Sequence, residues 1–156
     1  MNESQRLAKQ FDRALEGGAW YGPSWREVLD GVTRAQALHR PIPEAHSIAE
    51  VVLHAATWQD VVRQRLAGGS PQVPDDQDWQ VVKLPDDAAW TAVVNRLFET
   101  GKALRDQVES FAPERLQELR SGVDDSWYGL IVGEMQHVLY HAGQIGLLKK
   151  SLPKTG

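Results

Sequence analysis

The sequence predicts an all-α protein, a four-helix bundle with short helical connectors between the first and second long helices. Four long segments repeat apolar residues at the spacing of an amphipathic helix. Clusters of glycine and proline separate these segments, and helix-capping residues stand before several of them. No segment carries the pattern of a strand, so packing the apolar faces of the helices together is the way to bury them.

The first long helix is predicted over residues 3–16, where apolar residues recur at helical spacing until Gly17 ends the pattern. Two short helices are expected in the connector that follows, with Ser24 and Thr33 as their N-caps, because a hydroxyl oxygen accepts from the free amides of the first turn. Pro41 then prevents the second of them from continuing.

The second long helix begins at Ser47, because Ser47 and Glu50 have the spacing of a capping box. Its apolar residues form one broad arc, and His54 lies inside the edge of that arc, so this side chain is expected to face inward. Gly68 begins the turn that ends the helix. Residues 70–85 are predicted to be a polar loop lying over one end of the domain.

The third long helix is predicted from residue 86 to residue 110, and its acidic start suits the positive end of the helix dipole. Residues 112–119 are expected to add a turn of helix behind a proline. The last helix begins at a cluster of capping residues, 124–126, and runs to about Lys150.

The composition is that of a soluble globular protein, and residues 1–156 are expected to form a single domain. The net charge of −4 with interspersed signs provides no basic stripe, so nucleic acid is not an expected partner. No apolar run is long enough to span a membrane, and a cytoplasmic location is the simplest expectation. Cysteine is absent, so any bound metal must be held by nitrogen and oxygen atoms.

Two histidines of the last helix, His137 and His141, are spaced to bind one ion. Residues four apart lie on the same side of a helix, about 6 Å apart along its axis, so their imidazoles can converge. Both project along a flank of the buried arc, where a neutral imidazole needs a hydrogen-bond partner or a metal. The pair by itself also arises by chance, so a third ligand decides its meaning.

His54 is the candidate third ligand, and a hydrogen-bonded core histidine is the alternative. Three histidines without a fourth protein ligand would leave a position open for water or substrate, as in a reactive site. Imidazole suits zinc, nickel, iron or copper, and zinc or nickel is preferred here. His39 and His46 fall in the connector, where solvated side chains are the favoured interpretation.

Three polar residues stand one turn from a candidate ligand. Glu134 precedes His137 and either orients that ligand, acts as a general base through water, or forms a surface ion pair. Gln144 follows His141 and either reaches the site or lies on the helix surface. Glu50 precedes His54, but its capping box already accounts for it.

Two segments carry a resemblance to a known family: PEAHSIAEVVLHAATW at residues 43–58 and GEMQHVLYHAGQI at residues 133–145. With these segments the chain resembles the DinB-like (YfiT-like) superfamily of metal-dependent enzymes over most of its length. In that family one histidine of the second long helix and a His-x-x-x-His pair of the fourth bind a divalent metal. The resemblance therefore implies that His54, His137 and His141 are the metal ligands.

The resemblance also implies a four-helix bundle, often a homodimer, with nickel, zinc or iron in an open site. Similar members include thiol S-transferases that use bacillithiol or mycothiol, a thiol-dependent maleylpyruvate isomerase, and proteins described only as metal-dependent hydrolases. Their common chemistry is a metal that lowers the pKa of a bound thiol or water and presents it to an electrophile.

Three hypotheses for function follow. In the first, the chain is an enzyme acting on a small-molecule substrate, a hydrolase or a thiol S-transferase whose three-histidine metal site activates water or a low-molecular-weight thiol. In the second, it is a non-catalytic metal-binding module, structural or for stress response, held together by the ion. In the third, it is a metal-free helical interaction domain whose histidines are hydrogen-bonded in the core.

Overall fold

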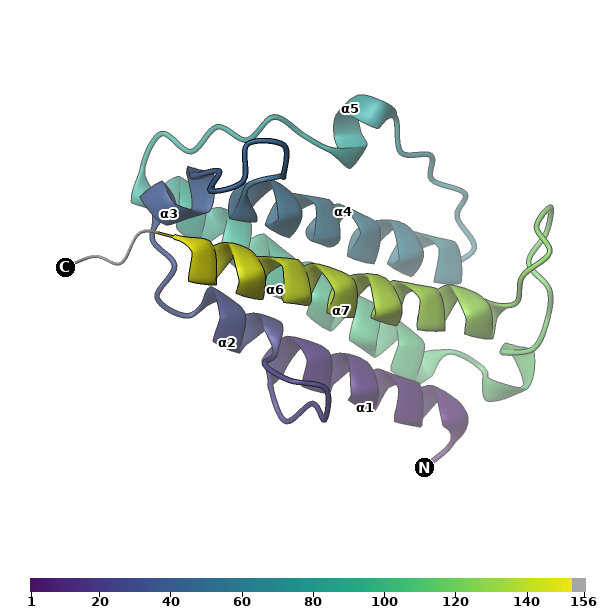
Figure 1. Cartoon of the computed structure of the whole chain (residues 1–156). Helices are drawn as coiled ribbons and strands as arrows, with labels where there is room; N and C mark the ends of the chain where they lie inside the picture. The colour runs from purple at the N-terminus through teal and green to yellow at the C-terminus, as the bar shows by residue number, and fades with distance from the viewer. Residues whose placement is uncertain (153–156) are drawn as a thin grey trace.

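The computed structural model describes residues 1–152, in which helices are the regular elements and one isolated bridge joins Leu119 to Ser126. The elements are α1 (Glu3–Glu16), α2 (Trp25–Leu29), α3 (Arg34–Leu38), α4 (Ile48–Leu66), α5 (Asp75–Asp78), α6 (Asp87–Ser110), the 3-10 turn η1 (Pro113–Arg115) and α7 (Trp127–Ser151). The predicted all-helical fold with four long helices is confirmed (Figure 1).

The four long helices pack in a cyclic order that brings α4 and α7 together. Helix α6 packs against α1 and α4, and α7 packs against the same two helices from the other side. Helices α1 and α4 are therefore diagonal to each other in the bundle, as are α6 and α7 (Figure 1). The two helices that carry the candidate metal ligands are neighbours along the bundle.

Local sequence explains where the helices begin. Ser24, Thr33 and Ser47 each accept a hydrogen bond from the amide of the third residue of the helix that follows, and each helix returns a side-chain contact to the cap. Ser126 caps α7 by accepting from the amide of Gly129 at 3.1 Å. Each cap satisfies amides that a helix start would otherwise leave without a partner.

Two buried tryptophans attach the short connector helices to the bundle. The indole Nε1 of Trp25 donates to the carbonyl oxygen of Val138 in α7 at 2.9 Å. Trp90 of α6 donates in the same way to the carbonyl oxygen of Val32 at 2.8 Å. Both rings are buried, so each side chain contributes apolar area and one satisfied hydrogen bond to the core.

Close packing of α6 depends on one glycine. A Cβ atom at Gly101 would lie 2.5 Å from Cδ1 of Leu15 in α1 and 3.3 Å from Nε2 of the buried Gln59 in α4. The missing side chain therefore lets three long helices approach one another at this level of the bundle.

The segment between α4 and α6 differs from its prediction. Residues 70–85 contain the one-turn helix α5, and the segment runs along α4 to reach His54 instead of covering an end of the domain (Figure 1). The acidic and proline-rich sequence of this segment does not indicate its contact with His54, because the packing partner lies on another helix. None of the helices in residues 1–152 is both long and apolar enough to cross a membrane.

Candidate metal centre

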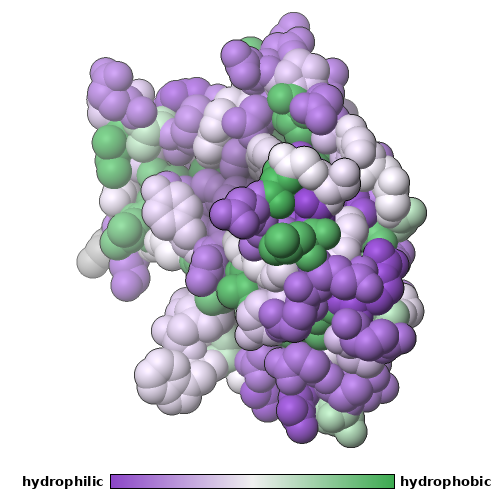
Figure 2. Space-filling model, turned by 90° about the vertical axis from the view of Figure 1, so that its right-hand side faces the viewer, coloured by the Kyte–Doolittle hydropathy of each residue, from purple (hydrophilic) through white to green (hydrophobic). Residues whose placement is uncertain are grey.

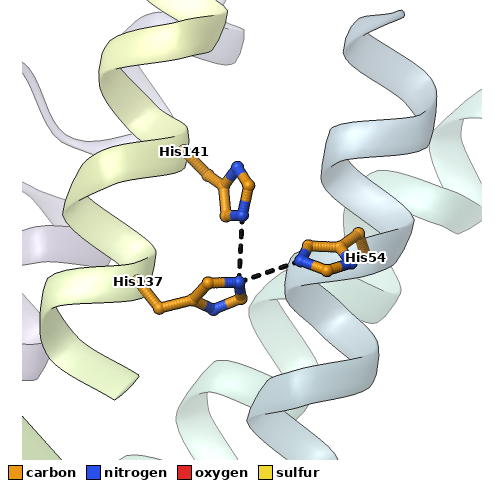
Figure 3. Close-up of side chains that lie close together, drawn as sticks. All are labelled: His54, His137 and His141. Carbon is orange, nitrogen blue, oxygen red and sulfur yellow. Dashed lines mark hydrogen bonds between the residues drawn. The ribbon is translucent and has the colours of Figure 1, made fainter. Parts of the chain in front are cut away.

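The structure brings the three predicted histidines together. His54 comes from the second turn of α4, and His137 and His141 come from the middle of α7 (Figure 3). The side chains of His54 and His141 are buried, and that of His137 is 25% exposed. One nitrogen from each ring lies within 4.8 Å of the others, so the cluster can hold a metal ion.

The Nε2 atoms of the three rings point toward one another. Nε2 of His137 lies 2.9 Å from Nε2 of His54 and 2.9 Å from Nε2 of His141 (Figure 3). The rings meet edge to face, with interplanar angles of 64° for His54 and His137 and 88° for His137 and His141. The lone pairs of these three Nε2 atoms, one from α4 and two from α7, therefore converge.

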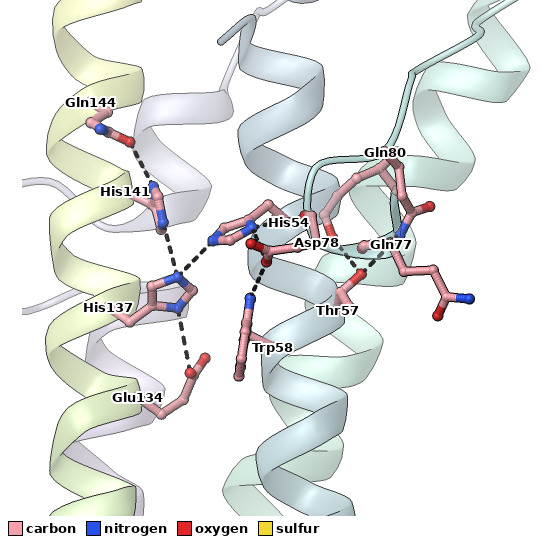
Figure 4. Close-up of polar contacts among 11 residues, drawn as sticks. His54, Thr57, Trp58, Gln77, Asp78, Gln80, Glu134, His137, His141 and Gln144 are labelled. Carbon is pink, nitrogen blue, oxygen red and sulfur yellow. Dashed lines mark hydrogen bonds and ion pairs between the residues drawn. The ribbon is translucent and has the colours of Figure 1, made fainter. Parts of the chain in front are cut away.

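The Nδ1 atom of His54 is held by the segment that contains α5. It lies 2.9 Å from the carbonyl oxygen of Asp78 and 3.0 Å from Oδ1 of the same residue (Figure 4). The indole Nε1 of Trp58 donates to that Oδ1 at 2.6 Å and holds the carboxylate in place. Thr57 accepts from the side chain of Gln80 at 3.2 Å, which ties the segment to α4 at a second point.

The Nδ1 atoms of the other two histidines face residues of their own helix. Nδ1 of His141 lies 2.6 Å from Oε1 of Gln144, one turn later (Figure 4). Nδ1 of His137 lies 3.4 Å from Oε2 of Glu134, one turn earlier. Glu134 is buried, so it is not a surface ion pair, and its Oε1 has no hydrogen-bond partner among the described residues.

These contacts favour one tautomer for each ring. A carbonyl oxygen accepts but cannot donate, so Nδ1 of His54 must be the protonated nitrogen. Gln144 Oε1 and the carboxylate of Glu134 favour the same tautomer for His141 and His137. Three rings in this tautomer direct three unprotonated Nε2 atoms at one point. A bound cation stabilises this arrangement, whereas the rings by themselves do not stabilise it. The residues present therefore fit a metal ion.

Burial favours the neutral imidazole of His54 and His141. Burial lowers the pKa of His141 to about 4, and the neighbouring histidines act in the same direction. Burial likewise lowers the pKa of His54, while the hydrogen bond to Asp78 opposes the shift. Burial raises the pKa of Glu134, against the opposing effect of His137. A metal ligand must be the neutral imidazole, so low pKa values suit this role.

An aromatic stack covers the His54 side of the cluster. The ring of Trp79 lies face to face with His54, with the centroids 3.9 Å apart, and its other face stacks on His46 at 3.6 Å. The side chain of His46, which was expected to be solvated, is 43% exposed, and its ring also packs on Trp79. His39 is exposed and lies outside the cluster, and Glu50 caps α4 and pairs with Arg40.

Sequence reasoning did not identify Asp78 or Trp79 as parts of the site. Both belong to a segment that is 24 or more residues away from His54 and has no helical spacing to it. Gln144 and Glu134 were found because helical spacing relates them to their histidines.

A pocket of about 410 Å³ opens beside the cluster, within the size range of small-molecule sites. Among its lining residues are the two candidate ligands His54 and His137, together with Glu134. Trp58 and Leu130 contribute apolar wall. The cluster is thus accessible from the side that faces α4 and the first turns of α7.

A search of curated proteins and a search of solved structures each found no match to this chain. The model of one protein family, the DinB superfamily, matches residues 23–145. The matched range includes all three histidines and both segments on which the resemblance was based. With this match over most of its length, the chain belongs to the DinB superfamily.

Proposed function

We propose that this protein is a metal-dependent enzyme in which His54, His137 and His141 hold one divalent cation through Nε2. The observation that carries the proposal is the orientation of the three rings, with each Nε2 directed inward and each Nδ1 facing an acceptor. Nitrogen donors and the absence of cysteine favour zinc or nickel, with iron as a further candidate.

The cation would supply Lewis acidity, lowering the pKa of a water molecule or low-molecular-weight thiol in the pocket. Three protein donors are one fewer than a closed structural zinc site uses, which supports a reactive role over a purely structural one. The proposed reaction class is therefore hydrolysis or thiol S-transfer onto a small electrophile.

The residues around the histidines have separate proposed roles. Asp78 and Gln144 are positioning residues, because each accepts from an Nδ1 and so fixes a ring and its tautomer. Glu134 is the proposed proton acceptor for the water or thiol, since it lines the pocket and its Oε1 has no hydrogen-bond partner within residues 1–152. Trp58 supplies an apolar wall that excludes water from one side of the reacting groups.

Elemental analysis of protein purified without an affinity tag tests the proposal, because a histidine-rich tag would bind metal itself. We expect one equivalent of a divalent metal per chain. Protein that neither carries metal nor binds added zinc or nickel would favour the metal-free interaction domain.

A thermal-shift screen of the metal-loaded protein with low-molecular-weight thiols separates the remaining alternatives. A thiol-specific rise in Tm would select the transferase, since a ligand that binds only the folded state raises stability. Collapse of the helical fold on metal removal, with no exchange of ligands at the ion, would favour the non-catalytic module. The small-molecule substrate, the homodimer and the cytoplasmic location remain predictions.

A further inference from the structure

Arg65 presents an unpaired positive charge in the same pocket. It lies in the last turn of α4, about three helical turns after His54, and its side chain is partly buried. Among residues 1–152 no carboxylate lies within 4.0 Å of its guanidinium, and it donates no hydrogen bond. Arg63, two residues earlier, differs because it is paired with Asp60 at 2.7 Å.

Trp58 connects this charge to the histidine cluster. The guanidinium carbon of Arg65 lies 5.6 Å from the centroid of the Trp58 ring. The same indole lies 6.4 Å from the ring of His54 and 6.3 Å from the ring of His137. A small molecule lying along this aromatic wall can therefore reach from the histidines to the guanidinium.

The acidic residues of the pocket already have partners or are buried. Asp78 accepts from His54 and Trp58, and Asp125 pairs with Arg120 at 2.8 Å. Glu134 is buried beside His137. Arg65 is thus the lining cation whose charge no described residue balances, while three acids nearby disfavour a ligand with several negative charges.

Arg65 also lines a second pocket of about 480 Å³ at the end of the bundle, between the turn after α4 and the segment before α7. Figure 2 shows this end of the molecule, where hydrophilic side chains dominate and hydrophobic ones form small separate patches. The surface around Arg65 therefore suits a charged group at the end of a small ligand better than an apolar chain.

We propose that Arg65 selects substrates that carry a single carboxylate at the end remote from the reacting group. The inference rests on the proposed function, because it assumes that the reacting group lies at the histidine cluster. The guanidinium presents parallel N–H donors that match the two oxygens of a carboxylate, which a lysine does not reproduce. Apolar atoms between the two ends of the ligand would lie against Trp58.

The test uses two thiols of equal length, 6-mercaptohexanoate and 6-mercaptohexan-1-ol, with cobalt-loaded protein. The absorbance of the cobalt–thiolate bond reports the Kd of each thiol. We expect the acid to bind about 10-fold more tightly than the alcohol, as for a hydrogen-bonded charged group. The preference should vanish in Arg65→Ala, fall in Arg65→Lys and persist in Arg63→Ala. Equal binding by the wild type, or a preference that survives Arg65→Ala, would overturn the proposal.

A measurement on metal-free protein separates failure of this inference from failure of the metal site. Hexanoate and hexanamide are titrated while the NMR signal of the Arg65 side-chain N–H is followed. A shift caused by hexanoate and not by hexanamide supports the carboxylate site even if cobalt does not bind. If hexanoate and hexanamide give the same result in this titration, the proposed carboxylate site is contradicted, whether or not the protein can bind a metal.

Discussion

The two helices that form the histidine cluster position their rings in different ways. Helix α7 contains its own supporting residues, since Glu134 and Gln144 each lie one turn from the histidine they face. Helix α4 contributes His54 but not the acceptor for its Nδ1, which comes from Asp78 in a separate segment. One half of the site is local in sequence, and the other depends on tertiary packing.

This difference indicates which half tolerates disturbance. The α7 half persists wherever the helix forms, because helical spacing alone sets the contacts. The α4 half requires the segment with α5 to stay docked. Around α5 this docking depends on the bonds of Asp78 to His54 and Trp58, the bond of Gln80 to Thr57, and the stack of Trp79 on His54. Segments with few buried contacts open locally at low free-energy cost.

The largest expected effect comes from removing a proposed ligand on either helix. His54→Ala, His137→Ala and His141→Ala should each abolish stoichiometric metal binding, because two imidazoles do not hold a divalent ion as three do. Elemental analysis measures the loss, and circular dichroism checks that the helices remain. His39→Ala is the matched control, since His39 is exposed and outside the cluster. Full metal content in any one triad variant would contradict the proposed ligand set.

The second prediction concerns pH and the metal-free protein. Because burial lowers the pKa of His141 to about 4, the unfolded chain binds a proton between pH 6.5 and 4 that the folded chain does not. The free energy of unfolding should therefore fall with decreasing pH in this window, by up to about 3 kcal/mol from His141. Urea denaturation at several pH values measures the slope. Glu134 has a raised pKa and contributes in the opposite direction.

His141→Asn isolates the contribution of that imidazole. The variant should lose stability less steeply between pH 6.5 and 4 than the wild type, while His39→Asn should keep the wild-type slope. Identical slopes for the wild type and His141→Asn would mean that the ring is protonated in the folded state without penalty.

The third prediction tests the local half of the site. Glu134→Gln keeps the shape of the side chain but removes the negative charge that faces Nδ1 of His137. Metal affinity should fall about 10- to 100-fold, the range found when a partner of a ligating histidine is lost. Competition with a chromophoric chelator gives the affinity. An unchanged affinity would show that Glu134 does not support His137, leaving only its proposed role as a base.

The smallest expected effect comes from the α4 half of the site, which depends on tertiary packing. Asp78→Asn removes the carboxylate charge, but the backbone carbonyl of residue 78 still accepts from Nδ1 of His54. We expect a loss of metal affinity of about 10-fold or less, at the low end of the same range. Hydrogen exchange of amides 75–80 should quicken, because the bond from Trp58 weakens. A larger loss than in Glu134→Gln would reverse the ranking of the two halves.

Much of the fold was predictable because its determinants are local. The predicted N-caps Ser24 and Thr33, the capping box at Ser47 and the glycine after α1 placed the helix boundaries within one or two residues of those observed. A cap acts within one turn, and helical periodicity repeats within four residues, so both can be recognised from the sequence alone. The inward orientation of His54 followed from the same periodicity.

The sequence by itself determined the four long helices and the inward-facing histidines, and it named Glu134 and Gln144 as candidate partners, because all of these depend on contacts within about one helical turn. Only the tertiary structure decided that α4 lies beside α7, that Asp78 and Trp79 complete the environment of His54, and that Arg65 faces the pocket. These features require residues far apart in the chain to meet, and the packing of the whole core selects which surfaces do so.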